Sequence, residues 1–155
     1  MIDIFNAHAT DPNKELKGVA VPLPGCGDVR FVIARANNKN YQKAVQHQYK
    51  KHKAVIDGKG EEAEKLSKAI VADVMAKTVL LGWQDAEGKP CTIPYKGKQH
   101  AYSVEIAAAM LSHADFAAKV EEASADFNNY KLVQDAEDEG NSESGLSGSS
   151  SGDQS

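Results

Sequence analysis

The sequence has few of the features that mark a secreted or membrane protein. Its two cysteines, Cys26 and Cys91, lie far apart and outside any Cys-x-x-Cys motif, which indicates free thiols in a reducing compartment. The longest apolar stretches fall well short of the ~20 residues that a membrane-spanning helix needs. The first five residues lack the basic flank and apolar core of a signal peptide. With a mean hydropathy of -0.48, the chain is expected to be soluble and cytoplasmic, without a membrane partner.

Recognisable patterns of catalytic or metal-binding side chains are also lacking. The five histidines have no Cys, Asp or Glu at ligand spacing, and His47 and His52 are too far apart to share a helix face as a metal pair. Residues 24–28 are typical of a tight turn, the alternative being a reactive thiol at Cys26. Catalytic triads, paired carboxylates and phosphate-binding glycine loops are missing. We therefore expect no enzyme activity, no metal and no cofactor.

Charge is distributed unevenly along the chain. From Asp135 onward there are six acidic residues and no Lys or Arg, which gives this segment a charge of -6. The overall charge is -4, so residues 1–134 carry +2. Residues 30–59 carry eight basic residues against Asp57 alone, a local charge of +7. A solvated or partner-facing helix is the favoured interpretation of that segment. Nucleic-acid binding is disfavoured, because no helix-turn-helix, zinc-finger or RNA-recognition motif accompanies it.

Hydrophobic periodicity predicts a mainly α fold with one short N-terminal β-hairpin. The hairpin pairs residues 19–23 with residues 29–35, and prolines demote the first strand to an edge. Helices are expected over residues 41–55, 61–81, 104–113 and about 116–130. The second has a broad apolar stripe, which is typical of a central helix buried on more than one side. Gly82 and Trp83 end this second helix. After it we expect a short strand over residues 91–95 and an exposed loop over residues 96–100.

These expectations divide the chain into three parts. Residues 1–28 form an irregular lead-in with an edge strand, and residues 29–134 form a small helical domain. Residues 135–155 are acidic and rich in Gly and Ser, so burial cannot offset the entropy of ordering them, and they are expected to be disordered.

The order of short motifs over residues 29–131 resembles the tail assembly chaperones of long-tailed bacteriophages. A strand precedes Asn-rich residues, a helix closes on Gly-Trp, a Gly-centred turn follows, and Tyr-Ser opens the penultimate helix. The residues that carry the resemblance are Arg35-Ala36-Asn37-Asn38, Tyr41, Thr78-Val79-Leu80-Leu81-Gly82-Trp83, Asp85-Ala86-Glu87-Gly88-Lys89-Pro90, Pro94-Tyr95, Tyr102-Ser103-Val104-Glu105 and Ala109-Met110-Leu111. Residues 92–101 form a small insertion relative to that pattern.

The resemblance implies a largely helical protein of the host cell cytoplasm that assists virion assembly and is missing from the mature particle. Such chaperones coat the tape measure protein and recruit tail tube protein, and many also exist in a longer, frameshifted form. Self-association is a further expectation. An apolar groove would be needed to shield a helical partner. Aromatic residues and Met concentrate at interfaces, which makes Trp83, Tyr95, Tyr102 and Met110 the candidate residues for this groove. For each of them, packing in the core is the stronger alternative.

Two other functions stay open at this point. The chain could be a minor structural tail or head-tail protein, which would be found in purified virions. It could also be a small regulator that binds nucleic acid through residues 30–59, which a shift of DNA or RNA at low salt would reveal.

Overall fold

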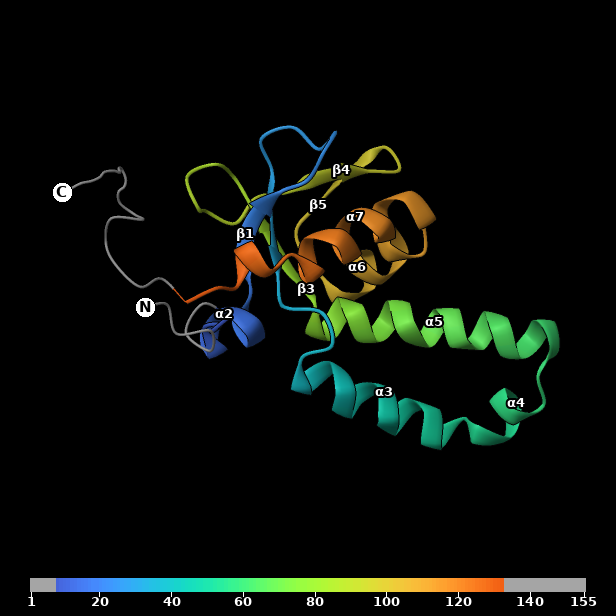
Figure 1. Ribbon diagram of the computed structural model, residues 1–155. Coiled ribbons are helices and arrows are strands. Elements are labelled where there is room, and N and C mark those ends of the chain that lie inside the picture. The colour runs from blue at the N-terminus through green and yellow to red at the C-terminus, as the bar shows by residue number, and fades with distance from the viewer. Residues whose placement is uncertain (1–7, 133–155) are drawn as a thin grey trace. The chain divides into compact units, whose positions relative to one another are not determined.

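The computed structural model describes residues 8–132, and the expected acidic tail over residues 135–155 lies outside them. Contacts divide the chain into two units. Residues 12–130 make up one unit, which contains every helix and strand considered below (Figure 1). In the described part of the other unit, Thr10 and Lys131 form an antiparallel bridge, and the amide of Leu132 donates to the carbonyl of Ala9 at 3.0 Å.

The predicted N-terminal hairpin is confirmed. Strand β1 (Val19–Pro22) pairs antiparallel with β2 (Arg30–Ile33), with Val21 opposite Phe31. Alternate β2 side chains, Phe31 and Ile33, are buried, as expected of a strand with one face on a core. The turn between the strands is also as predicted, since the amide of Cys26 donates to the carbonyl of Leu23 at 3.1 Å.

The prediction of a mainly α fold is wrong. Among residues 8–132, strands make up 18% and helices 53%, and the strands form two sheets, so the fold is mixed α/β. The main error lies in the predicted helix over residues 61–81. Helix α5 (Gly60–Thr78) ends early, and β3 (Leu80–Gln84) pairs antiparallel with β2, placing Trp83 opposite Phe31.

Helix α5 ends at Thr78, which takes part in two side-chain hydrogen bonds. The Thr78 hydroxyl donates back to the carbonyl of Val74 at 2.7 Å, and the Asn38 side-chain amide donates to the carbonyl of Thr78 at 3.0 Å. Beyond that point the apolar run fits a helix and a buried strand equally well. Pairing with β2 decides the outcome, because it satisfies the backbone groups of β3 while Leu80 and Trp83 are buried.

Two smaller expectations also need correction. The lead-in is not irregular throughout, since α2 (Pro12–Lys17) lies within it. The strand expected near residues 91–95 is present as β4 (Ile93–Tyr95), but the following residues are not simply a loop. Instead β5 (Lys98–His100) pairs with β4 through a turn at Lys96 and Gly97, which have φ of 52° and 81°. Two consecutive residues with positive φ are the geometry of a tight hairpin turn.

The remaining helices lie near their predicted positions, except that the last one ends at Ala125 and not at about residue 130. Helix α3 (Lys39–Lys51) and α4 (Lys53–Asp57) replace the single helix expected over residues 41–55. His52 kinks the chain between them, although the hydrogen bond from the His52 amide to the carbonyl of Gln48 carries the helical pattern into the kink. The C-terminal helices are α6 (Val104–Leu111), capped by Ser103, and α7 (Ala114–Ala125), followed by the 3-10 turn η1 (Phe127–Asn129).

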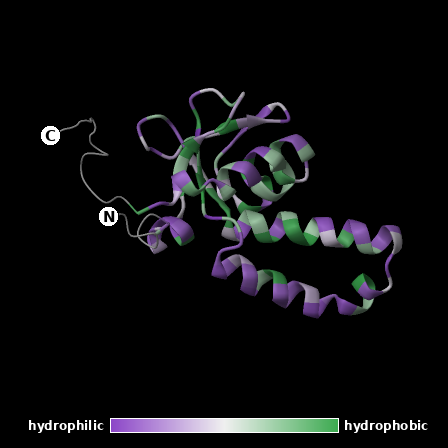
Figure 2. Cartoon of the chain, viewed as in Figure 1, coloured by the Kyte–Doolittle hydropathy of each residue, from purple (hydrophilic) through white to green (hydrophobic). Residues whose placement is uncertain are grey.

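Helix α5 is central, as its broad apolar stripe predicted, because α3 packs on one side of it and α6 on another (Figure 1). The core lies between the three-stranded sheet and helices α5, α6 and α7. Its buried apolar residues are Leu23, Phe31, Ile33, Met75, Ala76, Val79, Leu80, Trp83, Ile93, Ala107, Met110, Leu111 and Val120. Figure 2 shows this part as largely hydrophobic and α3 as largely hydrophilic. No helix within residues 8–132 has the length and hydrophobicity to cross a bilayer.

Candidate partner-binding site

An apolar groove with a volume of about 620 Å³ lies between α5 and the α6–α7 corner, within residues 12–130. Met75 and Leu111 are buried at its base, and Val71, Ala72 and Ala117 are partly exposed along it. Alanine side chains are too short to fill the space between three helices. The hollow therefore exists because small residues of α5 and α7 face one another there. We call it the α5–α7 groove.

Charged residues border this groove on different helices. Lys65 and Lys68 come from α5, whereas Glu121 comes from α7, and all three are exposed. Within residues 8–132 none of the three takes part in an ion pair. The groove thus presents an apolar floor with positive charge on one wall and negative charge on another, which gives a bound segment a preferred orientation.

The groove continues along α5 toward α4. A second hollow of about 450 Å³ shares Ser67 and Lys68 with it and reaches Ala63 and Ile56. From Ala63 to Met75 is a rise of about 18 Å at 1.5 Å per residue, or about three helical turns. The length along α5 therefore suits a helical segment better than a single side chain.

Two of the four predicted site residues lie together: Trp83 is in the core, and Tyr102 is partly buried and packs against it. Only 3% of Trp83 is exposed, and its ring packs edge-on against Tyr102 with centroids 5.0 Å apart. The indole N–H donates to the carbonyl of His100 at 3.2 Å. The Tyr102 hydroxyl lies 2.6 Å from the carbonyl oxygen of Ala76 and 2.8 Å from that of Leu80, and burial raises the pKa of Tyr102. Both rings tie the sheet to α5, and a partner contact for them stays a prediction.

The other two, Tyr95 and Met110, line a separate small hollow of about 270 Å³ with His113 and Phe116. The Tyr95 hydroxyl lies 2.9 Å from Nε2 of His113, which joins the β4–β5 hairpin to the end of α6. Met110 is buried, whereas Tyr95 is partly exposed. The structure thus brings these two together but places neither in the α5–α7 groove, and their contact with a partner also stays a prediction.

The groove residues themselves were not singled out from the sequence. Val71 and Met75 belong to the broad apolar stripe of α5. That excess width was the available signal, because helices α3 and α6 do not cover all of it. The alanines of α7 gave no signal, since a small residue on a helix is compatible with close packing and with an open hollow alike.

Reactive chemistry is not evident in the part of the chain that the structure describes. No group of three or more His, Cys, Asp or Glu side chains there could hold a metal ion. Cys26 and Cys91 are free thiols. The Cys26 loop is instead held in place from outside, because the Lys119 amino group donates to the carbonyl of Pro24 at 2.8 Å. What the described geometry offers is a surface for binding.

Comparison with known proteins places the chain in a family. No curated protein and no solved structure matches it. The family described as YdaY prophage protein matches residues 36–141, which is more than half of the chain and includes every helix of the α5–α7 groove. The chain therefore belongs to the YdaY prophage protein family and is of phage origin.

Proposed function

We propose that this prophage protein is a tail assembly chaperone that binds an apolar helical segment of the tape measure protein in the α5–α7 groove and assists tail tube assembly. The groove is the single observation that carries this proposal. The phage origin of the chain and the motif order over residues 29–131 also support the proposal. The protein acts by covering a surface of its partner, without catalysing a reaction, in the cytoplasm of the host cell and outside the mature virion.

The dimensions of the groove suit recognition of a helix. An amphipathic helix presents an apolar stripe at i, i+3, i+4 and i+7, which an apolar groove between helices can accept. Met75 and Leu111 form the base that such a stripe would contact, while Val71 and Ala117 would flank it. Acidic side chains of the partner would lie beside Lys65 and Lys68, and a basic one beside Glu121. Partner and orientation are thus specified by the same few side chains.

The shallow, partly exposed lining also suits a temporary complex. A chaperone must release its client when the tail tube replaces it, so binding must not be too tight. Interfaces well below ~1,600 Å² of total buried area are typical of weak or transient complexes. A groove of about three helical turns belongs to this class.

The test is to fill the groove without disturbing the core. Ala69→Phe places a ring in the groove from an exposed position on α5, and Ala114→Phe does so from an exposed position on α7. Ala118→Phe is the matched control, since Ala118 is exposed on α7 but does not line the groove. Each variant is coexpressed with the tape measure protein of the same prophage, and the soluble complex is measured by affinity purification of the full chain.

We expect the two groove variants to recover about tenfold less tape measure protein than the wild type and the Ala118→Phe control, because a loss of this size is common for central interface contacts. Unchanged melting temperatures would show that all variants fold. Wild-type protein that leaves the tape measure protein insoluble and unbound contradicts the proposal. So does finding the chain in purified virions at the abundance of a structural protein.

A further inference from the structure

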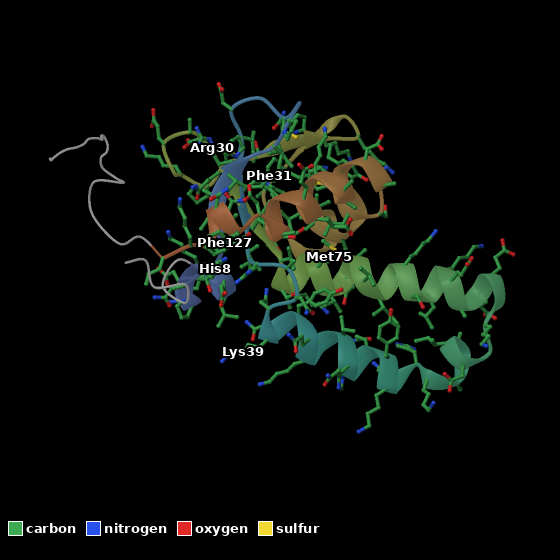
Figure 3. All side chains as sticks on the ribbon, in the orientation of Figure 1. His8, Arg30, Phe31, Lys39, Met75 and Phe127 are labelled. Carbon is green, nitrogen blue, oxygen red and sulfur yellow. The ribbon has the colours of Figure 1, made fainter. Side chains whose placement is uncertain are left out.

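Helix α3 has two faces of different character. Tyr41, Val45, Gln48 and Tyr49 are partly buried and form the side that faces α5. The opposite side carries Lys39, Lys43, His47 and Lys50, all exposed. Figure 3 labels Lys39 at the start of this row, among the long side chains that extend from α3. We call these four residues the α3 basic row.

The spacing of the α3 basic row makes it a single line. Its members follow one another by four, four and three residues, so they lie on one helix face. At 1.5 Å per residue, successive members are about 6, 6 and 4.5 Å apart along the axis. The row therefore offers positive charge over about 16 Å, close to three helical turns.

These lysines lack the partners that other lysines of the chain have. Lys53 pairs with Asp57 at 2.6 Å and Lys77 with Asp73 at 2.9 Å, each four residues away on its own helix. By contrast, the sequence has no Asp or Glu anywhere in residues 29–56. Among residues 8–132 no carboxylate lies within 4.0 Å of an amino group of the α3 basic row. The positive charge of α3 is left available to an external anion.

We propose that the α3 basic row binds a short acidic helix of a partner protein. Carboxylates repeated every four residues on a helix are about 6 Å apart, which matches the row. Beyond the row, residues 51–65 contain four lysines and four acidic residues, and Lys53 pairs with Asp57, so the excess of positive charge ends with the row. An acidic helix of three or four turns matches the length of that excess, whereas a long polyanion would extend past it.

Two features make a nucleic acid the weaker fit. Duplex DNA carries a charge every ~1.7 Å on two strands, which favours basic residues spread over a broad surface instead of one row. In addition, Tyr41 and Tyr49 lie on the α5-facing side of α3, so the row has no aromatic ring on which an unpaired base could stack.

This second surface is separate from the α5–α7 groove. Helix α3 and the α6–α7 pair pack on different sides of α5 (Figure 1). An acidic helix on α3 and an apolar helix in the groove can therefore bind at the same time. The inference goes beyond the proposed chaperone function and does not depend on the identity of the groove's client.

The test uses a defined probe with the full-length chain. The probe is a labelled alanine-based peptide of about 20 residues, long enough to form a helix, with Glu at every fourth position. A peptide with Gln at those positions and a duplex DNA of similar length are measured beside it. Binding at low ionic strength is followed by fluorescence anisotropy for the wild type and two double variants.

The variants carry equal changes of charge. Lys43→Glu with Lys50→Glu reverses the α3 basic row, and Lys89→Glu with Lys98→Glu reverses two exposed lysines near the β3–β4 and β4–β5 turns. We expect the Glu peptide to bind the wild type and the control, and to bind the row variant about tenfold more weakly, because two attractive pairs become repulsive. Binding should also weaken about tenfold on raising salt from about 20 mM to 200 mM, since exposed charges are screened.

Three results would overturn the inference. One is failure of the Glu peptide to bind the wild type, and another is equal binding of the Gln peptide. The third is tighter binding of the duplex than of the Glu peptide, with loss in the row variant, which would assign α3 to nucleic acid instead. Circular dichroism of both double variants establishes that α3 remains helical. Groove variants such as Ala69→Phe should bind the Glu peptide normally, which separates this result from any failure of the proposed chaperone function.

Discussion

The three-stranded sheet and the helical arm, which we define as α3 and α4 (Lys39–Asp57), are stabilised in different ways. Phe31, Ile33, Leu80 and Trp83 of the sheet are at most 3% exposed, whereas neither helix of the arm contains a fully buried residue. Full burial of a large apolar side chain contributes about 1.5–3 kcal/mol, so the sheet supplies far more of the stability than the arm.

The difference also separates stability from recognition. Segments with few buried contacts open more easily than a core and tolerate change at their surface. The arm can therefore carry the α3 basic row, although this row contributes little to the stability of the fold. The sheet and its covering helices provide the rigid base from which α5 presents the groove.

The comparison is tested most strongly by truncating one aromatic ring in each region. Trp83→Ala should lower the free energy of unfolding by about 3–5 kcal/mol, because it leaves a cavity beside Phe31 and Tyr102. Tyr49→Ala in the arm should lower it by about 1 kcal/mol, since that ring is only partly buried. Urea denaturation of both variants and the wild type gives the two differences.

Equal losses in the two variants would show that the arm is part of the same cooperative core. A loss below about 1 kcal/mol for Trp83→Ala would mean that the ring is not a structural element. Contact with a partner would then be the main role of Trp83.

Sequence reasoning succeeded where the determining contacts are local. The β1–β2 hairpin follows from alternation and turn residues close together in the chain. The cap of α6 at Ser103, whose hydroxyl accepts from the amide of Ile106 at 3.1 Å, is decided by residues three apart. The α3 basic row is equally local, which is why residues 30–59 stood out as basic.

Sequence reasoning failed where contacts with a distant segment determine the local structure. Leu80 and Trp83 become a strand because β2, about 50 residues earlier, offers its free edge. The α5–α7 groove depends on the relative placement of three helices, so no segment by itself indicates it. Trp83 and Tyr102 were candidates for partner contact, with core packing the stronger alternative, because residue type does not distinguish a core aromatic from an interface aromatic.

The connection between arm and sheet can be weakened at one residue. Asn38 is 8% exposed; its Oδ1 accepts from the amide of Tyr41, while its Nδ2 donates to the carbonyls of Arg35 and Thr78. It therefore caps α3 and joins it to the end of α5. Asn38→Ala should cost about 2 kcal/mol, the sum of a lost cap and unsatisfied carbonyls. Hydrogen exchange should accelerate in α3 more than in β2.

Asn38→Ser is the control for that prediction, since its hydroxyl keeps a capping oxygen while the two donated hydrogen bonds are lost. It should lie between wild type and Asn38→Ala in stability. Uniform acceleration of exchange in both regions would contradict the idea that the arm opens separately.

The smallest expected difference concerns alkaline pH. Tyr130 is fully buried and donates its hydroxyl to the carbonyl of Ile33 at 2.9 Å, and burial raises the pKa of Tyr130 above its ordinary 10.0. Above pH 10 the unfolded chain loses this proton while the folded chain keeps it. Stability is therefore complete below pH 10 and should fall by about 1.4 kcal/mol per pH unit above it.

Tyr130→Phe should remove this part of the loss of stability at alkaline pH. At neutral pH it should lower the free energy of unfolding by about 1 kcal/mol, because the Ile33 carbonyl loses its hydrogen-bond donor. Burial also raises the pKa of Tyr41 in the arm, but that ring is partly exposed. Tyr41→Phe should therefore leave most of the alkaline loss in place. Urea denaturation between pH 9 and 11 measures both variants, and an equal change in pH dependence for the two would contradict the difference in burial between Tyr130, which is bonded to β2, and Tyr41 of the arm.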